Sequence, residues 1–388
     1  MALNCPVCAS KEHTLILELR GLPVAINAQS SPEESSAVPK GDMSLVVCNS
    51  CTHLFNAGFD ERLSSYDSSY ENSLHFSNHF REHAKTLAQR LVQEFDLRNE
   101  TVAEAGAGPG HFLELLCQEG VKNAYGFDPS YDPNRLGAPS QKGVTLSNNL
   151  FPSDGSIKAK MAMSQHVLEH LTSPVELLSI LKSATQETDN SIVYSEVPNG
   201  DLMIDKCALW DLIYEHISFF TKKSLATAVG LSGLSVHSTG ADFGDQFLWT
   251  ISKPGETLPV PVIDESTESA IDRTVKFGEK AREQIEAAKL ELQQYQRQGP
   301  VVLWGAGSKG MTYLNLIATN QQVSAVVDVN PRKTGFGVPG TDYVITTPES
   351  LVTLKPKTVL IANPVYKAEI ESILTSNGIT CNVTPLWV

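Results

Sequence analysis

Four cysteines near the N-terminus stand in two Cys-x-x-Cys pairs, Cys5 with Cys8 and Cys48 with Cys51. Four thiolates at two such spacings satisfy the tetrahedral coordination of a structural zinc ion, and they leave no position open for a substrate. A redox role is the alternative for a single pair of this kind, but it does not account for two pairs. We therefore predict a structural zinc ion in an N-terminal module, residues 1–60, which is too small to fold around a core of its own.

A glycine-rich turn in the segment Glu104-Ala-Gly-Ala-Gly-Pro-Gly110 follows the strand-like run Thr101–Ala105 and precedes a helical pattern. Gly106, Gly108 and Gly110 allow the backbone to pass close to a ligand before it enters the helix. Their spacing differs from the Gly-x-Gly-x-x-Gly fingerprint of dinucleotide-binding folds. On its own, the turn is equally compatible with a tight structural turn that binds nothing.

An acidic residue ends the next strand-like run, Ala124–Asp128, and lies 18 residues after Gly110. A carboxylate at the end of the second strand suits the two hydroxyls of a ribose. Glu104, before the glycines, suits the amino-acid end of S-adenosylmethionine. The turn and the acid together therefore predict that the chain binds S-adenosylmethionine through Glu104, the three glycines and Asp128.

A second glycine-rich turn, Trp304-Gly-Ala-Gly-Ser-Lys-Gly310, carries the Gly-x-Gly-x-x-Gly spacing itself. The strand-like run after it ends at Asp328, and this combination on its own is typical of NAD binding. The helix that begins in the turn could also hold a phosphate or another anion. The unit around it, residues 299–388, is about half of a complete dinucleotide-binding fold. Three alternatives stay open for this turn: substrate anchoring, a purely structural role, and a nicotinamide cofactor.

Alternating strand-like and helix-like patterns position both turns. The strand-like runs are Thr101–Ala105, Ala124–Asp128, Ala159–Ser164, Ser191–Val197, Leu234–Ser238, Phe247–Ile251, Val301–Trp304, Val323–Asp328 and Thr358–Ala362. Helical patterns cover residues 77–95, 111–119 and 311–318. Such alternation is typical of doubly wound α/β sheets.

A stretch rich in proline and glycine, Pro254–Val262, separates the two sets of elements, and the amphipathic pattern Ile271–Tyr295 predicts a long helix after it. The polar stretch Ser30–Lys40 is predicted to be a loop. We predict an α/β protein whose parts are the zinc-binding module (residues 1–60), a central Rossmann-like domain (61–255), a linker with the long helix (256–298) and a smaller C-terminal Rossmann-like domain (299–388).

The composition excludes several functional classes. The formal net charge of -14 argues against a nucleic-acid partner, because such proteins need a basic footprint. No apolar run is long enough to span a membrane, and the N-terminus has no signal-peptide pattern. Three of the seven cysteines lie outside the two pairs, which fits a reduced compartment better than a disulfide framework. We expect a cytoplasmic monomer or homodimer that acts on a small-molecule acceptor, with no membrane partner.

The block Met163-Ser-Gln-His-Val-Leu-Glu-His170, which follows a strand-like run and is expected to open a helix, resembles class I S-adenosylmethionine-dependent methyltransferases. These enzymes carry a similar block after their fourth strand. The resemblance implies that Gln165 and His166 lie against the cofactor, whereas the last two residues of the block are equally compatible with plain helix positions. The segment Ser195–Asn199 resembles the end of the fifth strand, which faces the substrate.

The order of the parts resembles the sugar C-methyltransferase family, and this resemblance covers nearly the whole chain. Its members methylate carbon 3 of nucleotide-linked keto-deoxysugars, and their zinc and C-terminal domains help to shape the substrate site. The matching positions are Glu215 and His216, in Trp210-Asp-Leu-Ile-Tyr-Glu-His-Ile-Ser-Phe-Phe220, and Tyr70, in Tyr66-Asp-Ser-Ser-Tyr-Glu-Asn-Ser73. The resemblance implies that these three residues belong to the catalytic site.

Two departures set this chain apart from that family. Tyr214 directly precedes Glu215, where the sugar enzymes read Tyr-x-Glu-His. The stretch Asp242–Phe247 has no arginine, where the sugar enzymes carry Gly-Gly-x-x-Arg. The chain is therefore similar to a sister branch with the same layout.

These observations predict a biosynthetic methyltransferase that adds a methyl group next to the carbonyl of a small metabolite, a keto sugar or a natural-product intermediate. Removing the proton from that carbon needs a base, and the imidazole of His216 has suitable chemistry near neutral pH, with Glu215 orienting it or relaying a proton. One alternative is O- or N-methylation on the same scaffold, with His216 as base for a hydroxyl. Another is an NAD-binding oxidoreductase or a non-catalytic binding protein that uses the second glycine-rich turn.

Overall fold

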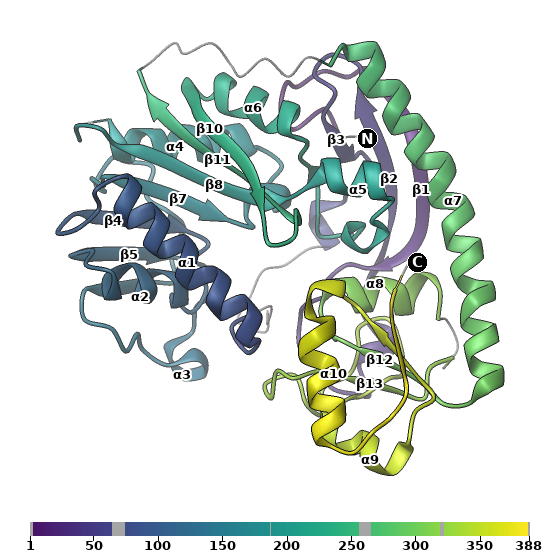
Figure 1. Ribbon diagram of the computed structural model, residues 1–388. Coiled ribbons are helices and arrows are strands. Elements are labelled where there is room, and N and C mark those ends of the chain that lie inside the picture. The colour runs from purple at the N-terminus through teal and green to yellow at the C-terminus, as the bar shows by residue number, and fades with distance from the viewer. Residues whose placement is uncertain (1–2, 64–73, 187, 256–264, 319–321, 387–388) are drawn as a thin grey trace.

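The computed structural model describes residues 3–63, 74–186, 188–255, 265–318 and 322–386. They form three β-sheets and the helices packed on them (Figure 1). Tyr70, a predicted active-site residue, lies outside the described residues. Within the described ranges, no helix combines the length and the apolar character that crossing a membrane requires.

The largest sheet has seven strands in the order β10-β11-β8-β7-β4-β5-β6. Its neighbouring strands are parallel except for β11, which runs antiparallel to both β10 and β8. The strands are β4 (Thr101–Ala105), β5 (Asn123–Phe127), β6 (Val144–Ser147), β7 (Met161–Gln165), β8 (Ile192–Pro198), β10 (Leu234–Asp242) and β11 (Phe247–Pro254). Helices α1 (Asn78–Glu94) and α2 (His111–Gln118) cover one face, and α4 (Pro174–Thr185) and α6 (Lys222–Leu231) cover the other.

Local signals account for where these elements begin. The hydroxyl of Ser77 caps α1 by accepting a hydrogen bond from the backbone N–H of Phe80. Leu87 and Leu91, four residues apart, are buried against α2 and the sheet. The predicted helix over residues 77–95 and the predicted strand Thr101–Ala105 are therefore both found at nearly the expected bounds.

The C-terminal sheet has five parallel strands in the order β14-β13-β12-β15-β16. They are β12 (Val301–Trp304), β13 (Ala325–Val327), β14 (Ile345–Thr346), β15 (Thr358–Ile361) and β16 (Asn382–Pro385). Helices α8 (Ser308–Leu316), α9 (Leu351–Leu354) and α10 (Lys367–Ser376) surround it. A parallel sheet covered on both faces explains why its central strands are continuous apolar runs.

The N-terminal residues form a four-stranded antiparallel sheet in the order β1-β2-β3-β9. Its strands are β1 (His13–Pro23), β2 (Lys40–Cys48), β3 (Leu54–Asn56) and β9 (Ser218–Phe219). The sheet therefore takes its last strand from a segment that the sequence placed in the central domain. Apolar residues on one face of the sheet share a hydrophobic cluster with the C-terminal unit, in which Leu17 of β1 and Leu303 of β12 both take part, whereas Phe55 of β3 belongs to a cluster with the central unit.

The stretch Ser30–Lys40, predicted to be a loop, contains the single 3₁₀ turn η1 (Ser35–Ala37) and leads into β2. It also contacts the C-terminal unit, because the hydroxyl of Ser35 donates to the carbonyl oxygen of Thr341 at 2.9 Å. A short bridge between Ser30 and Gly337 continues the same contact. The N-terminal and C-terminal parts of the chain are thus packed directly on each other.

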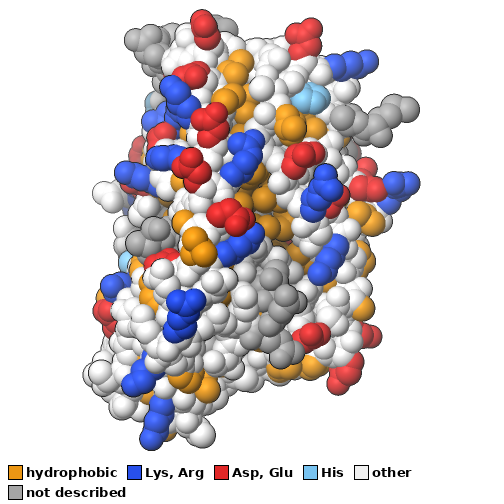
Figure 2. Space-filling model, turned by 90° about the vertical axis from the view of Figure 1, so that its right-hand side faces the viewer, with side chains coloured by type: hydrophobic (Ala, Val, Ile, Leu, Met, Phe, Trp, Pro, Cys, Tyr) orange, Lys and Arg blue, Asp and Glu red, His pale blue; other side chains and the backbone are white. Residues whose placement is uncertain are grey.

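The long predicted helix is α7 (Thr267–Gln298), which runs along the N-terminal sheet and down to the C-terminal unit (Figure 1). Its contact with β1 is close, since a Cβ on Gly278 would lie 2.5 Å from the carbonyl oxygen of Ile16. The same carbonyl accepts a hydrogen bond from Arg282 at 2.8 Å. On the face shown in Figure 2, acidic and basic side chains are interspersed rather than gathered by sign.

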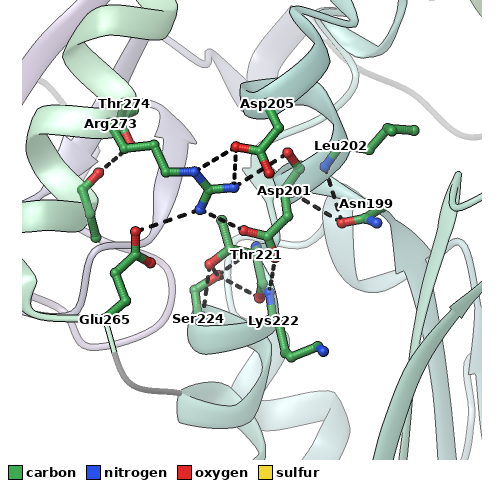
Figure 3. A network of polar contacts seen from close by, with 11 residues as sticks. Asn199, Asp201, Leu202, Asp205, Thr221, Lys222, Ser224, Glu265, Arg273 and Thr274 are labelled. Carbon is green, nitrogen blue, oxygen red and sulfur yellow. Dashed lines mark hydrogen bonds and ion pairs between the residues drawn. The ribbon is translucent and has the colours of Figure 1, made fainter.

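Arg273 joins α7 to the central unit (Figure 3). Its guanidinium donates to Asp205 at 2.7 Å and to Asp201 at 2.9 Å, both on α5 (Gly200–Lys206), and lies 3.7 Å from Glu265. Asp201 also accepts a hydrogen bond from the backbone N–H of Lys222, at the start of α6. Arg273 therefore joins α7 to α5 directly, and Asp201 continues the connection to α6.

Candidate active site

In each Rossmann-like sheet, the glycine-rich turn follows the strand at which the strand order reverses. From this strand the chain first adds strands on one side and later adds strands on the other side. β4 lies between β5 and β7, and β12 lies between β13 and β15. Ligands of open α/β sheets bind at such topological switch points. Residues of both turns line one cavity of about 1100 Å³ between the central and the C-terminal units.

The first turn is held in shape by the acid of the next strand. The backbone N–H of Gly108 donates to Asp128 Oδ2 at 2.7 Å, and Asp128 Oδ1 accepts from the backbone and the hydroxyl of Ser130 at 2.8 and 2.6 Å. Gly106 has a φ of 75°, which favours glycine. A Cβ there would lie 2.2 Å from Val167 Cγ2. The turn therefore requires glycine both for its conformation and for its packing.

Glu104 lies below this turn, near the end of β4, and lines the cavity. Its side chain is 3% exposed. Among the described residues, its Oε2 has no hydrogen-bond partner. Burial raises the pKa of its carboxyl to about 8, and the negative charges of Asp128 and Glu196 add to the effect. A buried carboxyl group of this kind favours a positively charged group on a ligand.

Gln165 and His166 lie where β7 ends and contact a second buried acid. Gln165 donates to Glu196 Oε1 at 3.3 Å, and the ring of His166 lies between Glu196 at 3.3 Å and Glu169 at 3.6 Å. Burial lowers the pKa of His166, but its contacts with Glu169 and Glu196 outweigh that effect and raise it to about 10. His166 has a φ of 54°, an uncommon conformation for a residue other than glycine. The ion pairs therefore hold a charged imidazole at the wall of the cavity.

The block from Met163 to His170 does not open a regular helix, contrary to the sequence-based expectation. It ends β7 and forms the single 3₁₀ turn η3 (Leu168–His170), and α4 begins only at Pro174. His166 has a left-handed conformation at this point, and Glu169 and His170 of η3 line the cavity.

His216 lies in the turn between η4 (Leu209–Asp211) and β9, and it lines the cavity. It is buried, and its ring centroid lies 4.9 Å from that of His170. Burial lowers the pKa of His216 well below its ordinary value, and the nearby His170 and His166 lower it further. The imidazole is therefore neutral at physiological pH, which is the form that can accept a proton.

Glu215 is buried next to His216 but points toward the N-terminal segment. Its Oε1 accepts a hydrogen bond from the backbone N–H of Asn27 at 3.2 Å. Burial raises the pKa of its carboxyl. Tyr214, which precedes it, accepts a hydrogen bond from the backbone N–H of Asp60 at 2.8 Å. Of the three predicted catalytic residues, the structure therefore brings His216 to the cavity wall and places Glu215 behind it.

The second turn repeats the geometry of the first. Ala306 N–H donates to Asp328 Oδ2 at 2.7 Å, and Asn330 N–H donates to Asp328 Oδ1 at 2.8 Å. Lys309 reaches from this turn to the central unit, where it donates to Gln246 Oε1 at 2.8 Å and lies 3.5 Å from Asp211. The C-terminal unit is thus connected to the cavity wall of the central unit by direct polar contacts.

Sequence analysis missed one cluster at this wall. Glu169, His170 and His216 each place one ligand-type atom within 4.8 Å of the others. Glu169 and His170 directly follow β7, and polar residues after a parallel strand are a signal that could have been used. His216 comes 46 residues after His170, so the grouping itself could not be read from spacing.

The four predicted zinc ligands come together at one end of the N-terminal sheet, where β2 ends at Cys48. The Sγ atoms of Cys5 and Cys51 are 3.6 Å apart, as are those of Cys8 and Cys48, and all four lie within 4.8 Å of one another. Four sulfurs around a zinc ion with bonds of about 2.3 Å would be about 3.8 Å apart. The cysteine cluster therefore has the dimensions of a four-thiolate metal site.

Comparisons with known proteins identify two parts of the chain. Residues 78–239 match the model of a methyltransferase domain. Residues 264–378 match the model of a C-methyltransferase C-terminal domain. A search of curated proteins finds no match.

Among solved structures, the magnesium protoporphyrin IX methyltransferase of Synechocystis PCC 6803 with bound SAH is similar at 15% identity, with a TM-score of 0.35 over 46% of this chain and 84% of that one. The 1,6-didemethyltoxoflavin-N1-methyltransferase of Burkholderia thailandensis is similar at 14% identity, with a TM-score of 0.36 over 46% of this chain and 80% of that one. These low values carry no part of the assignment, which rests on the two family models and on the sheet order. The chain belongs to the class I S-adenosylmethionine-dependent methyltransferases that carry a C-methyltransferase C-terminal domain.

Proposed function

We propose that this methyltransferase methylates a carbon atom next to a carbonyl group of a small metabolite, a keto sugar or a natural-product intermediate. The observation that carries the proposal is the neutral, buried His216 at the wall of the cavity that both glycine-rich turns line. The match of residues 264–378 to a C-methyltransferase C-terminal domain supports carbon as the acceptor atom. A hydrogen next to a carbonyl is acidic enough for an imidazole to remove in a pre-organised site.

The proposed cofactor site is the first turn and its surroundings. S-adenosylmethionine supplies a methyl group on a positively charged sulfur when it is bound. We assign Asp128 to the ribose hydroxyls and Glu104 to the amino group, because the first sits at the strand end and the second is a buried carboxyl with an unpartnered oxygen. The glycines at 106, 108 and 110 would let the ligand approach the backbone, and Gln165 and His166 would border it.

In the proposed mechanism, His216 removes the proton from the acceptor carbon. Its neutral ring is the base, and the buried surroundings exclude water from the carbanion that forms. A base of this kind contributes about 10²–10⁴-fold to the rate. Glu215 supports the turn that carries His216 through its bond to the Asn27 backbone. Tyr70 stays a family-based proposal, because it lies outside the described residues.

We also propose that Cys5, Cys8, Cys48 and Cys51 bind one structural zinc ion. The cluster has the required dimensions. All four ligands are thiolates, so the metal would hold the loops at the end of the N-terminal sheet together and would take no part in the chemistry. The second glycine-rich turn is proposed to anchor the acceptor, since it lines the same cavity.

The deciding experiment is a labelled-methyl assay against a panel of nucleotide-linked keto sugars and simpler ketones, with the product analysed by mass spectrometry. The expected product carries the new methyl group on carbon. His216→Ala is expected to lower kcat by about 10²–10⁴-fold and to leave S-adenosylhomocysteine binding intact. A new methyl group on oxygen or nitrogen would show that the carbon assignment is wrong and that His216 is at most a base for a heteroatom.

A further inference from the structure

Glu169 carries a buried carboxylate for which the proposed reaction has no role so far. The residue lies in η3 and is 1% exposed. Its Oε1 is 3.6 Å from His166 Nδ1. In the part of the chain that the structure describes, its Oε2 has no hydrogen-bond partner. A buried oxygen left in this way costs free energy, so it calls for an explanation.

His216, the proposed base, also has a buried polar atom without a hydrogen-bond partner in the described part of the chain. Nδ1 of His216 is buried and, among the described residues, has no hydrogen-bond partner. One carboxylate oxygen of Glu169 and one ring nitrogen of His216 lie within 4.8 Å of each other. That limit is about 2 Å longer than a hydrogen bond, a gap that a side-chain adjustment can close.

We propose that Glu169 is a positioning residue for His216, whose protonated ring it binds during the reaction. The inference rests on the proposed function. When His216 acts, the carbon–hydrogen bond next to the carbonyl breaks, its electron pair forms the enolate, and the proton forms an N–H bond on the ring. The carboxylate of Glu169 then accepts a hydrogen bond from the imidazolium and neutralises its charge, as the acid of a catalytic triad does.

The other charges around His216 make such a partner necessary. His170, with its ring 4.9 Å away, together with His166 and Lys309, opposes a positive charge on His216. Among the carboxylates that pack nearby, Asp211 lies 3.5 Å from Lys309, whereas Glu169 keeps an oxygen, Oε2, without a hydrogen-bond partner among the described residues. The imidazolium therefore needs a negative partner from η3, the element on which Glu169 stands.

The carboxylate of Glu215 is bound by the N-terminal segment and is not part of the Glu169, His170 and His216 cluster. Its Oε1 is held by the backbone N–H of Asn27 at 3.2 Å. The carbonyl oxygen of the same residue lies 3.1 Å from His170 Nδ1 and fixes that ring. Glu169 is thus the carboxylate best placed to accept a hydrogen bond from the protonated ring of His216.

A divalent cation held by Glu169, His170 and His216 is the competing explanation, because the three groups are close enough. The charged ring of His166, 3.6 Å from Glu169, disfavours it, because a divalent cation next to Glu169 would be repelled by that ring. A metal bound there would also remove His216 as a base. The two explanations therefore make opposite predictions for metal removal.

The test compares Glu169→Gln, which keeps the size of the side chain, with wild type and with the exposed control Glu82→Gln. The acceptor is the ketone that the labelled-methyl assay identifies. We measure kcat, KM, and exchange of the acceptor's proton with deuterated water in the presence of S-adenosylhomocysteine, from about pH 4.5 to 9, because the acid limb that His216 controls lies below the ordinary pKa of histidine. Glu169→Gln is expected to lower kcat and exchange about 10- to 100-fold, with KM and cofactor affinity within about twofold.

Two further readouts separate positioning from a structural role. Without the carboxylate His216 is a weaker base, so the acid limb of the kcat profile should move to lower pH in Glu169→Gln. Glu169→Asp keeps the charge and should recover part of the lost rate, and it serves as the test if the glutamine variant does not fold. Glu82→Gln should match wild type throughout.

Three outcomes would overturn a proposal, and they are distinguishable. If His216→Ala abolishes exchange while Glu169→Gln behaves as wild type, the positioning role is wrong and the proposed function stands. If His216→Ala keeps full exchange, the proposed base itself is wrong. If EDTA stops exchange and Glu169→Gln loses a metal ion that Cys48→Ser retains, the cluster is a metal site and the pairing is refuted.

Discussion

Asp128 and Asp328 make the same contact in the two Rossmann-like units: each accepts a hydrogen bond at 2.7 Å from a backbone N–H inside the preceding glycine-rich turn. The donors are Gly108 in the first unit and Ala306 in the second. In both units the second oxygen of the acid is bound by the backbone two residues later. The two acids therefore fix the shapes of two turns that face one cavity.

Replacing Asp128 should weaken the cofactor. Asp128→Asn keeps an acceptor for Gly108 but loses the charged hydrogen bonds proposed for the ribose hydroxyls. Hydrogen bonds to charged groups contribute about 1.5–3 kcal/mol, which corresponds to about 10- to 100-fold in affinity. Calorimetry with S-adenosylhomocysteine measures this, with the exposed Asp154→Asn as control. Equal affinities of the two variants for S-adenosylhomocysteine would show that Asp128 does not bind the cofactor.

Cofactor binding should become tighter as the pH rises from about 6 to about 7.5. Burial raises the pKa of Glu104 to about 8, so its carboxyl is mostly protonated at pH 6 in the free protein. A positively charged amino group stabilises the ionised form, so binding releases a proton and the affinity increases with pH below the raised pKa. The comparison belongs below about pH 7.5, where the ligand's amino group remains charged.

Titration calorimetry in two buffers of different ionisation enthalpy counts the released protons. Glu104→Gln should bind more weakly and should lose both the proton release and the pH dependence. An unchanged pH dependence in that variant would mean that another group titrates.

The second turn offers a matched pair of glycines. A Cβ on Gly307 meets nothing within 4 Å, whereas a Cβ on Gly310 would lie 2.0 Å from the carbonyl oxygen of Gly305. Gly307→Val should therefore fold normally and project into the proposed acceptor site, raising KM for the acceptor with little effect on the cofactor. Gly310→Ala should destabilise the fold by about 1–3 kcal/mol. Melting curves and steady-state kinetics distinguish them, and an unchanged KM in Gly307→Val would argue for a purely structural turn.

Replacing a zinc ligand should lower the activity as well as the stability of the protein. β3 pairs with β9, where Leu54 lies opposite Phe219, and β9 begins two residues after His216. His53 also packs on Phe220, with ring centroids 4.8 Å apart. Cys48→Ser should therefore lose about one zinc per chain, lower Tm and reduce kcat, while S-adenosylhomocysteine still binds at the distant first turn. Elemental analysis and calorimetry check both parts, and a disulfide between Cys5 and Cys8 without metal would refute the site.

Much of the central fold could be predicted from sequence because its signals are local. The strand Thr101–Ala105, the glycines after it and the acid at position 128 follow one another within about one βαβ unit, and each has a backbone reason to be there. The grouping of the four cysteines could also be predicted from sequence, because two Cys-x-x-Cys spacings are typical of a four-thiolate metal site.

The cavity wall was harder to predict because its contacts join distant segments. Glu169 and His216 meet only after η3 and the η4 turn fold onto each other. His166 adopts a left-handed conformation next to η3, and this conformation could not be predicted because the residue is not a glycine. Strand β9 is two residues long, too short for any alternation to reveal.

The pairing of β3 with β9 also sets the order in which the chain can mature. Residues 54–56 leave the ribosome long before residues 218 and 219, and α7, which covers β1, follows later still. Until these later segments are synthesised, the N-terminal sheet lacks its fourth strand and the helix that covers its apolar residues. The four-stranded sheet of residues 13–56 can therefore be completed only after residues 218 and 219 have been synthesised.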